Sequence, residues 1–373
     1  MTRHDQLKKL LQSGDCFKMI CGAGNEDPAY VKKLALIYTL AGAKILDVSC
    51  NVNVIKHAME GIDLAFELSD TLGVEITDRP FIMSSIGMPG DHHVRKSYID
   101  PDKCIGCNLC IPVCPTHAIP EKFTLNLPVF QELGGSFEEE DQSKEIVIKD
   151  LCIGCGKCGS ICPKDDIISY RHNAGCETFE LHAAVGEEDI TVEEWALINK
   201  INTTNYNSMC LDRLNLGNLK LEHRIQKAVD IAPDRTIIQA DGYPMSGGED
   251  DFNTTMQAVA CADVINKKFN MRKDPKRKTV TGKASRSSKK AYRTLKNAKV
   301  IPIVLSGGTN SLSRELAEKC GVRCNGIAIG TFARDIIEEF IQVEDFYENN
   351  DTIRSAYEVA RNLVVKNKMK ELV

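Results

Sequence analysis

Short apolar runs alternate with amphipathic stretches along most of the chain, and their order predicts a parallel sheet. The first run, CFKMICGAG (16–24), ends in glycines, as a buried parallel strand does. It is followed by DPAYVKKLALIYTLAG (27–42), which has helical spacing, Asp27 at the N-cap and Gly42 at the C-terminal end. Repeated pairs of this kind are typical of βα units around a parallel sheet.

The same alternation continues through the chain and predicts seven strands, with an eighth that the pattern leaves uncertain. After the first pair, strands are predicted at 43–50, 79–87, 176–184, 235–242, 299–310 and 325–334, and helices at 53–73, 192–204, 254–269, 311–321 and 335–342. We place the eighth strand near 205–217. Eight such units predict a TIM-like (β/α)8 barrel, and a doubly wound open sheet is the alternative.

After the strand at 79–87 the alternation stops, and two cysteine-rich stretches follow. CIGCNLCIPVCP begins at Cys104 and CIGCGKCGSICP at Cys152, and both have the spacing C-x2-C-x2-C-x3-C-P. Over 98–166 this resembles bacterial two-cluster ferredoxins, in which the fourth cysteine, before the proline, binds the other [4Fe–4S] cluster. The predicted ligands are Cys104, Cys107, Cys110 and Cys162 for one cluster, and Cys152, Cys155, Cys158 and Cys114 for the other.

The cysteine content indicates metal or redox chemistry. A pair of zinc knuckles is the alternative for the two stretches, but zinc sites use pairs of ligands rather than four-cysteine runs that end in Cys-Pro. Sixteen cysteines in a long chain do not fit a short, secreted disulfide scaffold, so we predict a reducing, cytoplasmic location. No long apolar run and no hydrophobic leader is present, so we expect no membrane span and no signal peptide.

These patterns divide the chain into three parts. We predict that residues 1–91 form the first part of the barrel, 92–172 an inserted α+β two-[4Fe–4S] domain, and 173–373 the rest of the barrel. Residues 267–299 are rich in Lys and Arg, with Asp274 as the one acidic residue. Such a block is typical of a solvated, flexible segment, and nucleic-acid binding is disfavoured because aromatic residues are few.

The loops after the last two predicted strands are candidates for a phosphate site. Barrel enzymes bind phosphate groups at these loops, here SGGTN (306–310) and IGTFAR (329–334). Flavin mononucleotide (FMN) is the candidate ligand, because a flavin converts single electrons into hydride chemistry. Glycines that simply end strands are the alternative. The residues predicted to bind the cofactor are Gly307, Gly308, Thr309, Gly330 and Thr331.

Three side chains at other strand ends are candidate catalytic residues. His182 is a candidate general acid or base, Asp241 lies in the glycine-rich stretch QADGYPMSGG (239–248), and Cys21 ends the first strand. A hydrogen-bonded histidine, a tight turn and a buried thiol are the respective alternatives. Whether the protein is an enzyme therefore stays open.

Several stretches together resemble the light-dependent period (LdpA) family of cyanobacteria. They are FKMICGAGNED (17–27), LALIYTLAGAKILDVSCNVNVI (34–55), the two cysteine motifs, QADGYPMSGG (239–248) and LSGGTN (305–310). The resemblance implies an iron–sulfur protein that reports cellular redox state and adjusts circadian timing, and it carries over the eight motif cysteines alone. The basic segment 267–299 departs from that family. A relative from an organism without a circadian clock would share only the iron–sulfur redox part of the family's function.

The predicted function is electron transfer or redox sensing by two [4Fe–4S] clusters, with a redox protein or a small electron carrier as partner. The alternative is an iron–sulfur flavoprotein oxidoreductase that holds FMN, or a substrate with a phosphate group, at the barrel mouth.

Overall fold

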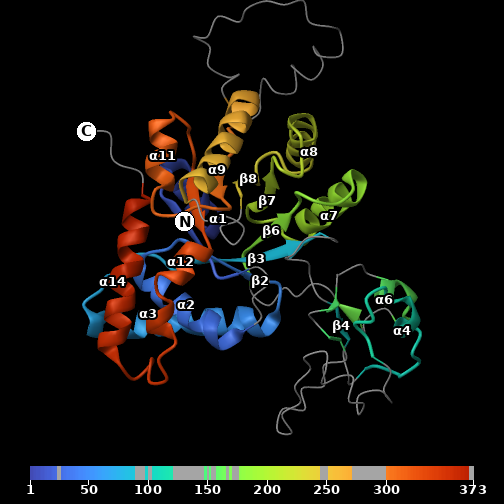
Figure 1. Cartoon of the computed structure of the whole chain (residues 1–373), viewed down its shortest axis with the longest axis horizontal. Helices are drawn as coiled ribbons and strands as arrows, with labels where there is room; N and C mark the ends of the chain where they lie inside the picture. The colour runs from blue at the N-terminus through green and yellow to red at the C-terminus, as the bar shows by residue number, and fades with distance from the viewer. Residues whose placement is uncertain are drawn as a thin grey trace, which may run out of the picture.

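The computed structural model describes residues 1–22, 27–88, 97–99, 103–120, 147–148, 151–152, 157–164, 168–169, 176–243, 251–270 and 300–368. Eight parallel strands close into a barrel in the order β1-β10-β9-β8-β7-β6-β3-β2 (Figure 1), which confirms the TIM-like barrel and excludes the open sheet. The strands are β1 (Cys16–Ile20), β2 (Ile45–Ser49), β3 (Phe81–Gly87), β6 (Thr178–His182), β7 (Asn207–Asp212), β8 (Thr236–Asp241), β9 (Ile303–Ser306) and β10 (Gly326–Ile329). The uncertain eighth strand of the sequence pattern is β7.

Helices surround the barrel. They are α2 (Pro28–Ala41), α3 (Val52–Leu72), α7 (Glu188–Ile201), α8 (Asn218–Ile231), α9 (Asp251–Ile265) with the π-helical turn η3 (Asn266–Asn270), α11 (Ser313–Lys319), α12 (Thr331–Asp335), α13 (Glu338–Ile341) and α14 (Asn350–Lys366). Helix α2 begins as predicted, because Asp27 Oδ1 accepts hydrogen bonds from the Ala29 and Tyr30 amides at 2.9 and 3.1 Å. The sequence pattern did not predict α8 or α14, and two short helices, α12 and α13, replace the single helix predicted at 335–342.

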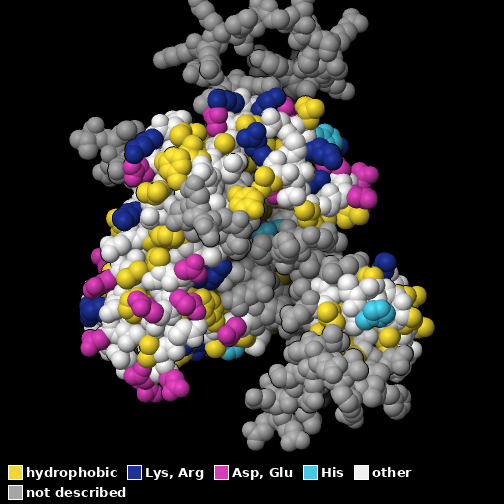
Figure 2. Space-filling model, viewed as in Figure 1, with side chains coloured by type: hydrophobic (Ala, Val, Ile, Leu, Met, Phe, Trp, Pro, Cys, Tyr) yellow, Lys and Arg dark blue, Asp and Glu magenta, His cyan; other side chains and the backbone are white. Residues whose placement is uncertain are grey.

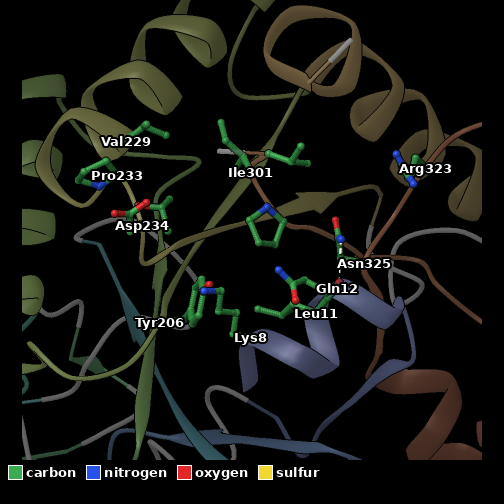
Figure 3. Close-up of a pocket in the computed structure, with 13 residues that line it drawn as sticks. Lys8, Leu11, Gln12, Tyr206, Val229, Pro233, Asp234, Ile301, Arg323 and Asn325 are labelled. Atoms are coloured by element: carbon green, nitrogen blue, oxygen red, sulfur yellow. Dashed lines mark hydrogen bonds between the residues drawn. The ribbon is translucent and has the colours of Figure 1, made fainter. Parts of the chain in front are cut away.

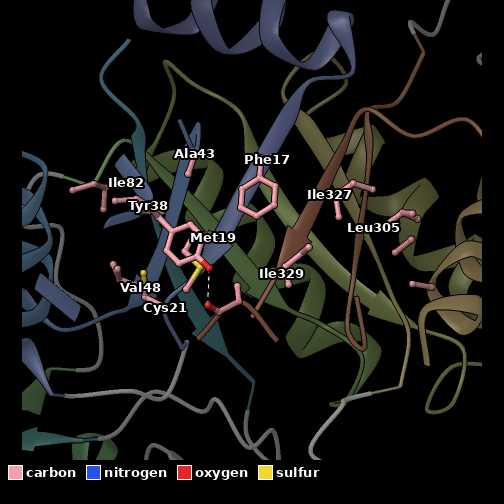
Figure 4. Packing of buried hydrophobic residues seen from close by; sticks show 14 of the residues in the cluster. Phe17, Met19, Cys21, Tyr38, Ala43, Val48, Ile82, Leu305, Ile327 and Ile329 are labelled. Carbon is pink, nitrogen blue, oxygen red and sulfur yellow. Dashed lines mark hydrogen bonds between the residues drawn. The ribbon is translucent and has the colours of Figure 1, made fainter. Parts of the chain in front are cut away.

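Alternate residues of each strand face the helices and the barrel interior. On β1 the outward residues are Phe17 and Met19, and the next outward position is Cys21; all three are buried against the helix layer, where Tyr38 of α2 also packs (Figure 4). The Tyr38 hydroxyl donates a 2.6 Å hydrogen bond to the Ala333 carbonyl. This layer is the main hydrophobic core of the protein.

Inward residues near the N-terminal end of the barrel, which we call the floor, form a second apolar core. They are Cys16, Ile45, Phe81, Met83, Ile237, Val304 and Ala328. A helix that the sequence pattern did not predict, α1 (Arg3–Ser13), covers them with Leu7 and Leu11, both almost fully buried. Thr2 and Asp5 form a capping box that fixes where α1 begins. The floor is therefore closed by apolar side chains, and the opposite, C-terminal end is the mouth.

A small unit lies between β3 and β6. It contains β4 (Tyr98–Ile99), α4 (Cys110–Val113), α6 (Lys157–Ile161) and β5 (Ile168–Ser169), with β4 and β5 paired antiparallel. Figure 1 shows it beside the barrel, outside the ring of strands. Because Met83 of β3 pairs directly with Thr178 of β6, the sheet closes without it.

Most of the predicted basic segment, 271–299, lies outside the described residues. Its first lysines belong to η3, where Lys267 and Lys268 form ion pairs of 2.5 and 2.7 Å with Asp263 and Glu222. Among the helices that the structure describes, none has the length and apolar character needed to cross a bilayer.

Candidate functional site

Seven of the eight motif cysteines are described, and six of them share one small core; Cys155 lies outside the described residues. Cys152 and Cys158 are buried in this core together with Ile99, Ala118, Ile119 and Val147, and Cys104, Cys110, Cys114 and Cys162 pack against it. Cys107 is exposed. Two motifs that are far apart in the sequence therefore converge on one site.

Hydrogen-bond donors point at the sulfur atoms. The Ser97 amide donates to Cys152 Sγ at 3.4 Å, and Ser97 Oγ lies 3.3 Å from Cys158 Sγ, so one serine contacts two cysteines of the second motif. The Ala118 amide donates to Cys114 Sγ at 3.2 Å. Burial works to raise the pKa of the Cys114 thiol, but hydrogen bonds from Thr116 and Ala118 outweigh it and lower that pKa. The thiolate, which is the ligand form, is thereby stabilised.

The first motif turns tightly around its own cysteines. Gly106 and Asn108 have left-handed φ values of 67° and 60°, and α4 begins at Cys110. Burial raises the pKa of the Cys110 thiol, and the nearby thiols of Cys104, Cys158 and Cys107 raise it further. A donor set made of thiols from both motifs, with amides directed at sulfur, fits iron–sulfur clusters. No three Cys, His, Asp or Glu side chains of the described ranges converge on a point suited to a single metal ion.

A second group of polar side chains fills the middle of the barrel. We call Lys18, Asp47, Ser85, Glu180 and Gln239 the lysine tier. The Lys18 ammonium is 2.6 Å from both Asp47 Oδ2 and Glu180 Oε2, and it donates to Gln239 Oε1 at 2.8 Å. Gln239 Nε2 donates to Glu180 Oε1 at 2.8 Å, and Ser85 Oγ donates to Asp47 Oδ1 at 2.5 Å. Five strands thus contribute to one buried network.

Closer to the mouth lies a further ring of polar residues, the mouth tier. Its members are Ser49, His182, Cys210, Asp241 and Ser306, each inward-facing near the end of its strand. His182 Nε2 is 3.6 Å from Glu180 Oε1, and Asp241 is hydrogen-bonded to Ser306 and Cys210. Burial raises the pKa of Asp241 to about 7; the Ser306 hydrogen bond opposes this, while Glu180 and Asp212 add to it.

The structure brings two of the three predicted catalytic candidates together. His182 on β6 and Asp241 on β8 both belong to the mouth tier, with Cys210 of β7 between them. Cys21 lies instead in the layer between barrel and helices, fully buried, and burial together with Asp47 raises the pKa of its thiol to about 12. Cys21 therefore packs between the barrel and the helices and does not face the interior.

The predicted phosphate loops are closely packed by the protein itself. A Cβ atom at Gly307 would lie 2.5 Å from Asp241 Oδ1, so a carboxylate borders that loop. The buried Thr309 hydroxyl donates to the Ala328 carbonyl at 2.5 Å. At the other loop, Gly330 and Thr331 lie beside Arg334, which donates to Thr331 Oγ1 at 3.2 Å. A phosphate site here stays a prediction.

A cavity of about 390 Å³ lies at the floor, at the opposite end from the mouth tier. Figure 3 shows Leu11 and Lys8 of α1 below it and Ile301 above it. Asn325, at its edge, donates to the Leu11 carbonyl at 2.8 Å. Because barrel enzymes work at the other end of their strands, this cavity is a poorer candidate for chemistry than the mouth tier.

Sequence reasoning missed the lysine tier. Lys18 stands in the middle of the otherwise apolar strand CFKMI, and Glu180 stands between two apolar residues in TFELH. A charged residue at an inward strand position is costly to bury unless it is paired, so such a residue is itself a signal for an interior site.

Comparisons with known proteins agree with the cysteine site. Residues 96–163 match the family model described as a 4Fe-4S dicluster domain. Light dependent period A of Synechococcus elongatus is 31% identical over 132 residues, which cover 28% of this chain and 36% of that protein. The match thus spans about a third of the relative's length.

Solved structures similar to this chain include two aldolases. The YdjI aldolase of Escherichia coli K12 has a TM-score of 0.44 and 6% identity, over 96% of this chain and 92% of that chain. A putative fructose-1,6-biphosphate aldolase from Coccidioides immitis has a TM-score of 0.41 and 7% identity, over 98% and 95%. The assignment of the fold rests on the strand order itself.

Proposed function

We propose that this LdpA-like iron–sulfur protein binds two [4Fe–4S] clusters and exchanges single electrons with a redox partner, as a carrier or as a redox sensor. The observation that carries the proposal is the convergence of cysteines from both motifs on one core. When bound, such clusters supply reversible one-electron chemistry. The chain supplies the cysteine thiolates that bind iron, the apolar side chains that exclude water, and the backbone amides that donate hydrogen bonds to sulfur.

The proposed division of ligands crosses the two motifs. Cys104, Cys107, Cys110 and Cys162 hold one cluster, and Cys152, Cys155, Cys158 and Cys114 hold the other. The contacts of Ser97 with both Cys152 and Cys158 support placing these two cysteines on the same cluster. Cys-Pro cysteines reach across to the second cluster in proteins with this spacing, which supports the exchange of Cys114 and Cys162.

The surface of the small unit between β3 and β6 suits a protein partner. Cys107 is exposed between Ile105 and Leu109, which are 58% and 47% exposed, and Ile161 is 42% exposed. Figure 2 shows hydrophobic side chains at the surface of this unit. Apolar side chains around an exposed ligand of a cluster allow a partner to approach within the short distance that electron transfer requires.

Anaerobic purification with iron and sulfide analysis tests the proposal. We expect about eight iron and eight sulfide per chain, and two interacting signals in the EPR spectrum of the reduced protein. Replacing Cys107 with Ser should lower the iron content, whereas Cys320→Ser, an exposed cysteine outside the motifs, should leave it unchanged. Bound zinc, or iron content insensitive to Cys107→Ser, would sink the proposal.

An FMN-dependent oxidoreductase is the second candidate, favoured by the polar mouth tier at the end of the barrel where enzymes of this fold react. The carboxylate of Asp241 beside Gly307 weighs against a phosphate at that loop. Flavin released from the purified protein by acid would establish this candidate. Cluster absorbance without flavin would rule out this candidate and leave electron transfer as the proposed function.

A further inference from the structure

Among the described side chains inside the barrel, carboxylates outnumber cations. Asp47 and Glu180 surround one cation, Lys18, and two more carboxylates, Asp212 and Asp241, lie at the mouth. Side-chain and backbone amides of Asn215 bind Asp212 at 2.8 and 2.7 Å, so that carboxylate is satisfied locally. The mouth tier therefore lies in a negative field that Lys18 does not balance.

The hydroxyl of Ser49, which is a member of the mouth tier, also indicates that a ligand binds there. Ser49 is 3% exposed, and its Oγ has no hydrogen-bond partner among the described residues. It follows Ile45 and Asp47 at alternate positions of β2, and both of these face the interior, so Ser49 does too. β2 lies opposite β8 in the ring of strands, which places Ser49 across the barrel from Asp241. A buried hydroxyl without a partner is costly unless a ligand or water binds it.

We propose that the mouth tier is a binding site for a small organic cation, an ammonium or guanidinium compound, whose charge pairs with the carboxylate of Asp241. Ser49 and His182 supply hydrogen-bonding groups around it. This site is separate from the clusters and does not depend on the proposed function.

An organic cation fits the interior better than a metal ion does. Asp47 and Glu180 are already bound to the Lys18 ammonium, so they are not available as metal ligands. Asp241 remains as a single carboxylate beside hydroxyl, thiol and imidazole groups, which is a donor set for N–H groups rather than for a hard divalent cation.

The ionisation of Asp241 makes the expected binding depend on pH. As pH rises through about 7 Asp241 loses its proton, so the affinity for a cation should rise over that range. Ser306, Glu180, Asp212 and Cys210 act directly on Asp241. Other charged or titratable groups around them are Lys18 near Cys210, His182 near Glu180, and Arg213 together with Cys261 of α9.

Calorimetry and thermal shift on the anaerobically purified full chain test the site, with agmatine and putrescine as probes. Succinate, 1,4-butanediol and magnesium chloride at equal ionic strength are the comparison compounds. We expect saturable binding of at least one amine, with affinity that increases from pH 6 to 8. Asp241→Asn should weaken it at least about tenfold, and Ser49→Ala should weaken it without loss of folding, since that hydroxyl has no partner to lose.

Asp230→Asn is the matched control, because Asp230 is an exposed aspartate of α8 that contacts Gln226. Retained visible absorbance shows that each variant still holds its clusters, so failure of this site is distinct from failure of the cluster proposal. The proposal is wrong if neither amine binds, if succinate or magnesium binds in preference, or if Asp230→Asn weakens binding as much as Asp241→Asn.

Discussion

Lys18 Nζ and Glu180 Oε2 lie 2.6 Å apart inside the barrel, although the two residues are 162 positions apart in the chain. Burial works to lower the pKa of Lys18, but Asp47 and Glu180 outweigh it and raise that pKa above its ordinary value. Lys18 is therefore a permanent cation, and it joins β1 to both β2 and β6. The ammonium is an electrostatic centre of the barrel and not a nucleophilic amine.

Lys18→Met should destabilise the protein by about 3–5 kcal/mol, because Asp47 and Glu180 would remain buried without their cation. The free energy of unfolding in urea measures this. Lys32→Met is the control: Lys32 pairs with the exposed Glu60 at 2.9 Å, so its loss should cost less than about 1 kcal/mol. Adding Glu180→Gln to Lys18→Met should restore part of the stability. Equal losses of unfolding free energy in Lys18→Met and Lys32→Met would show that the buried Lys18 stabilises the protein no more than the exposed Lys32 does.

Gly308→Ala should destabilise the protein more than Gly73→Ala. Both glycines have left-handed backbones, with φ of 72° and 63°, so the conformational cost of about 1–2 kcal/mol is common to both. A Cβ at Gly73 meets nothing within 4 Å, whereas one at Gly308 would collide with the Tyr243 carbonyl and lie 2.5 Å from Thr254 Cβ. The expected difference is a further 1–3 kcal/mol, roughly the cost of overpacking. Thermal unfolding of the pair measures it, and equal melting temperatures would contradict the close packing of the loop.

Ser97→Ala and Thr116→Val should lower the reduction potential of the same cluster. Ser97 Oγ lies 3.3 Å from Cys158 Sγ and Thr116 Oγ1 lies 3.8 Å from Cys114 Sγ, and the proposed ligand sets place both cysteines on one cluster. Donors to sulfur stabilise the more negative, reduced state, so their loss lowers the potential. A redox titration followed by EPR resolves the two clusters. Ser69→Ala, on the exposed face of α3, should shift neither. Shifts in different clusters would refute the exchange of Cys114 and Cys162.

Cys114→Ser provides a direct test of that exchange. It should chiefly remove the cluster held by Cys152, Cys155 and Cys158, not the one formed by its own motif. Iron analysis and EPR of the reduced variant measure the loss. Selective loss of the cluster held by Cys104 would contradict the expected ligand sets.

The stability that Asp241 confers should fall as pH rises from about 4 to about 7. Its folded-state pKa of about 7 lies above the ordinary value of 3.8, so the folded chain holds this proton more tightly than the unfolded chain does. Ionisation therefore favours unfolding within that window and adds nothing further above it. The free energy of unfolding of the wild type, relative to Asp241→Asn, should decrease across the window when measured in urea at several pH values. A difference that stays constant with pH would show that Asp241 has an ordinary pKa.

The sequence predicts the features of this protein that are local in the chain. The cysteine spacing identifies the dicluster motif because two or three residues separate successive ligands. The apolar runs locate seven of the strands and place the eighth, β7, less firmly near 205–217. Helix α8 was missed although Leu221, Ile225 and Ala228 have helical spacing, so its signal was present. For the lysine tier, the charges of Lys18 and Glu180 within their strands were a signal too, but their partners could not be predicted. The network forms only after five strands close into a ring, and no pattern within one strand shows which charge faces which.

After each of the strands β1, β2, β6 and β7, a long helix carries the chain from the mouth back to the floor. These helices are α2, α3, α7 and α8, respectively. Between β3 and β6, the helices described are α4 and α6, of four and five residues, and both belong to the cysteine unit. Among the described residues of this connection, the cysteine unit therefore stands where the other units have a crossover helix. Since bound metal organises the residues that ligate it, loading the clusters should reduce the entropy lost when this long connection closes β3 against β6. We therefore expect oxidative loss of iron to lower the stability of the barrel as well as that of the cysteine unit.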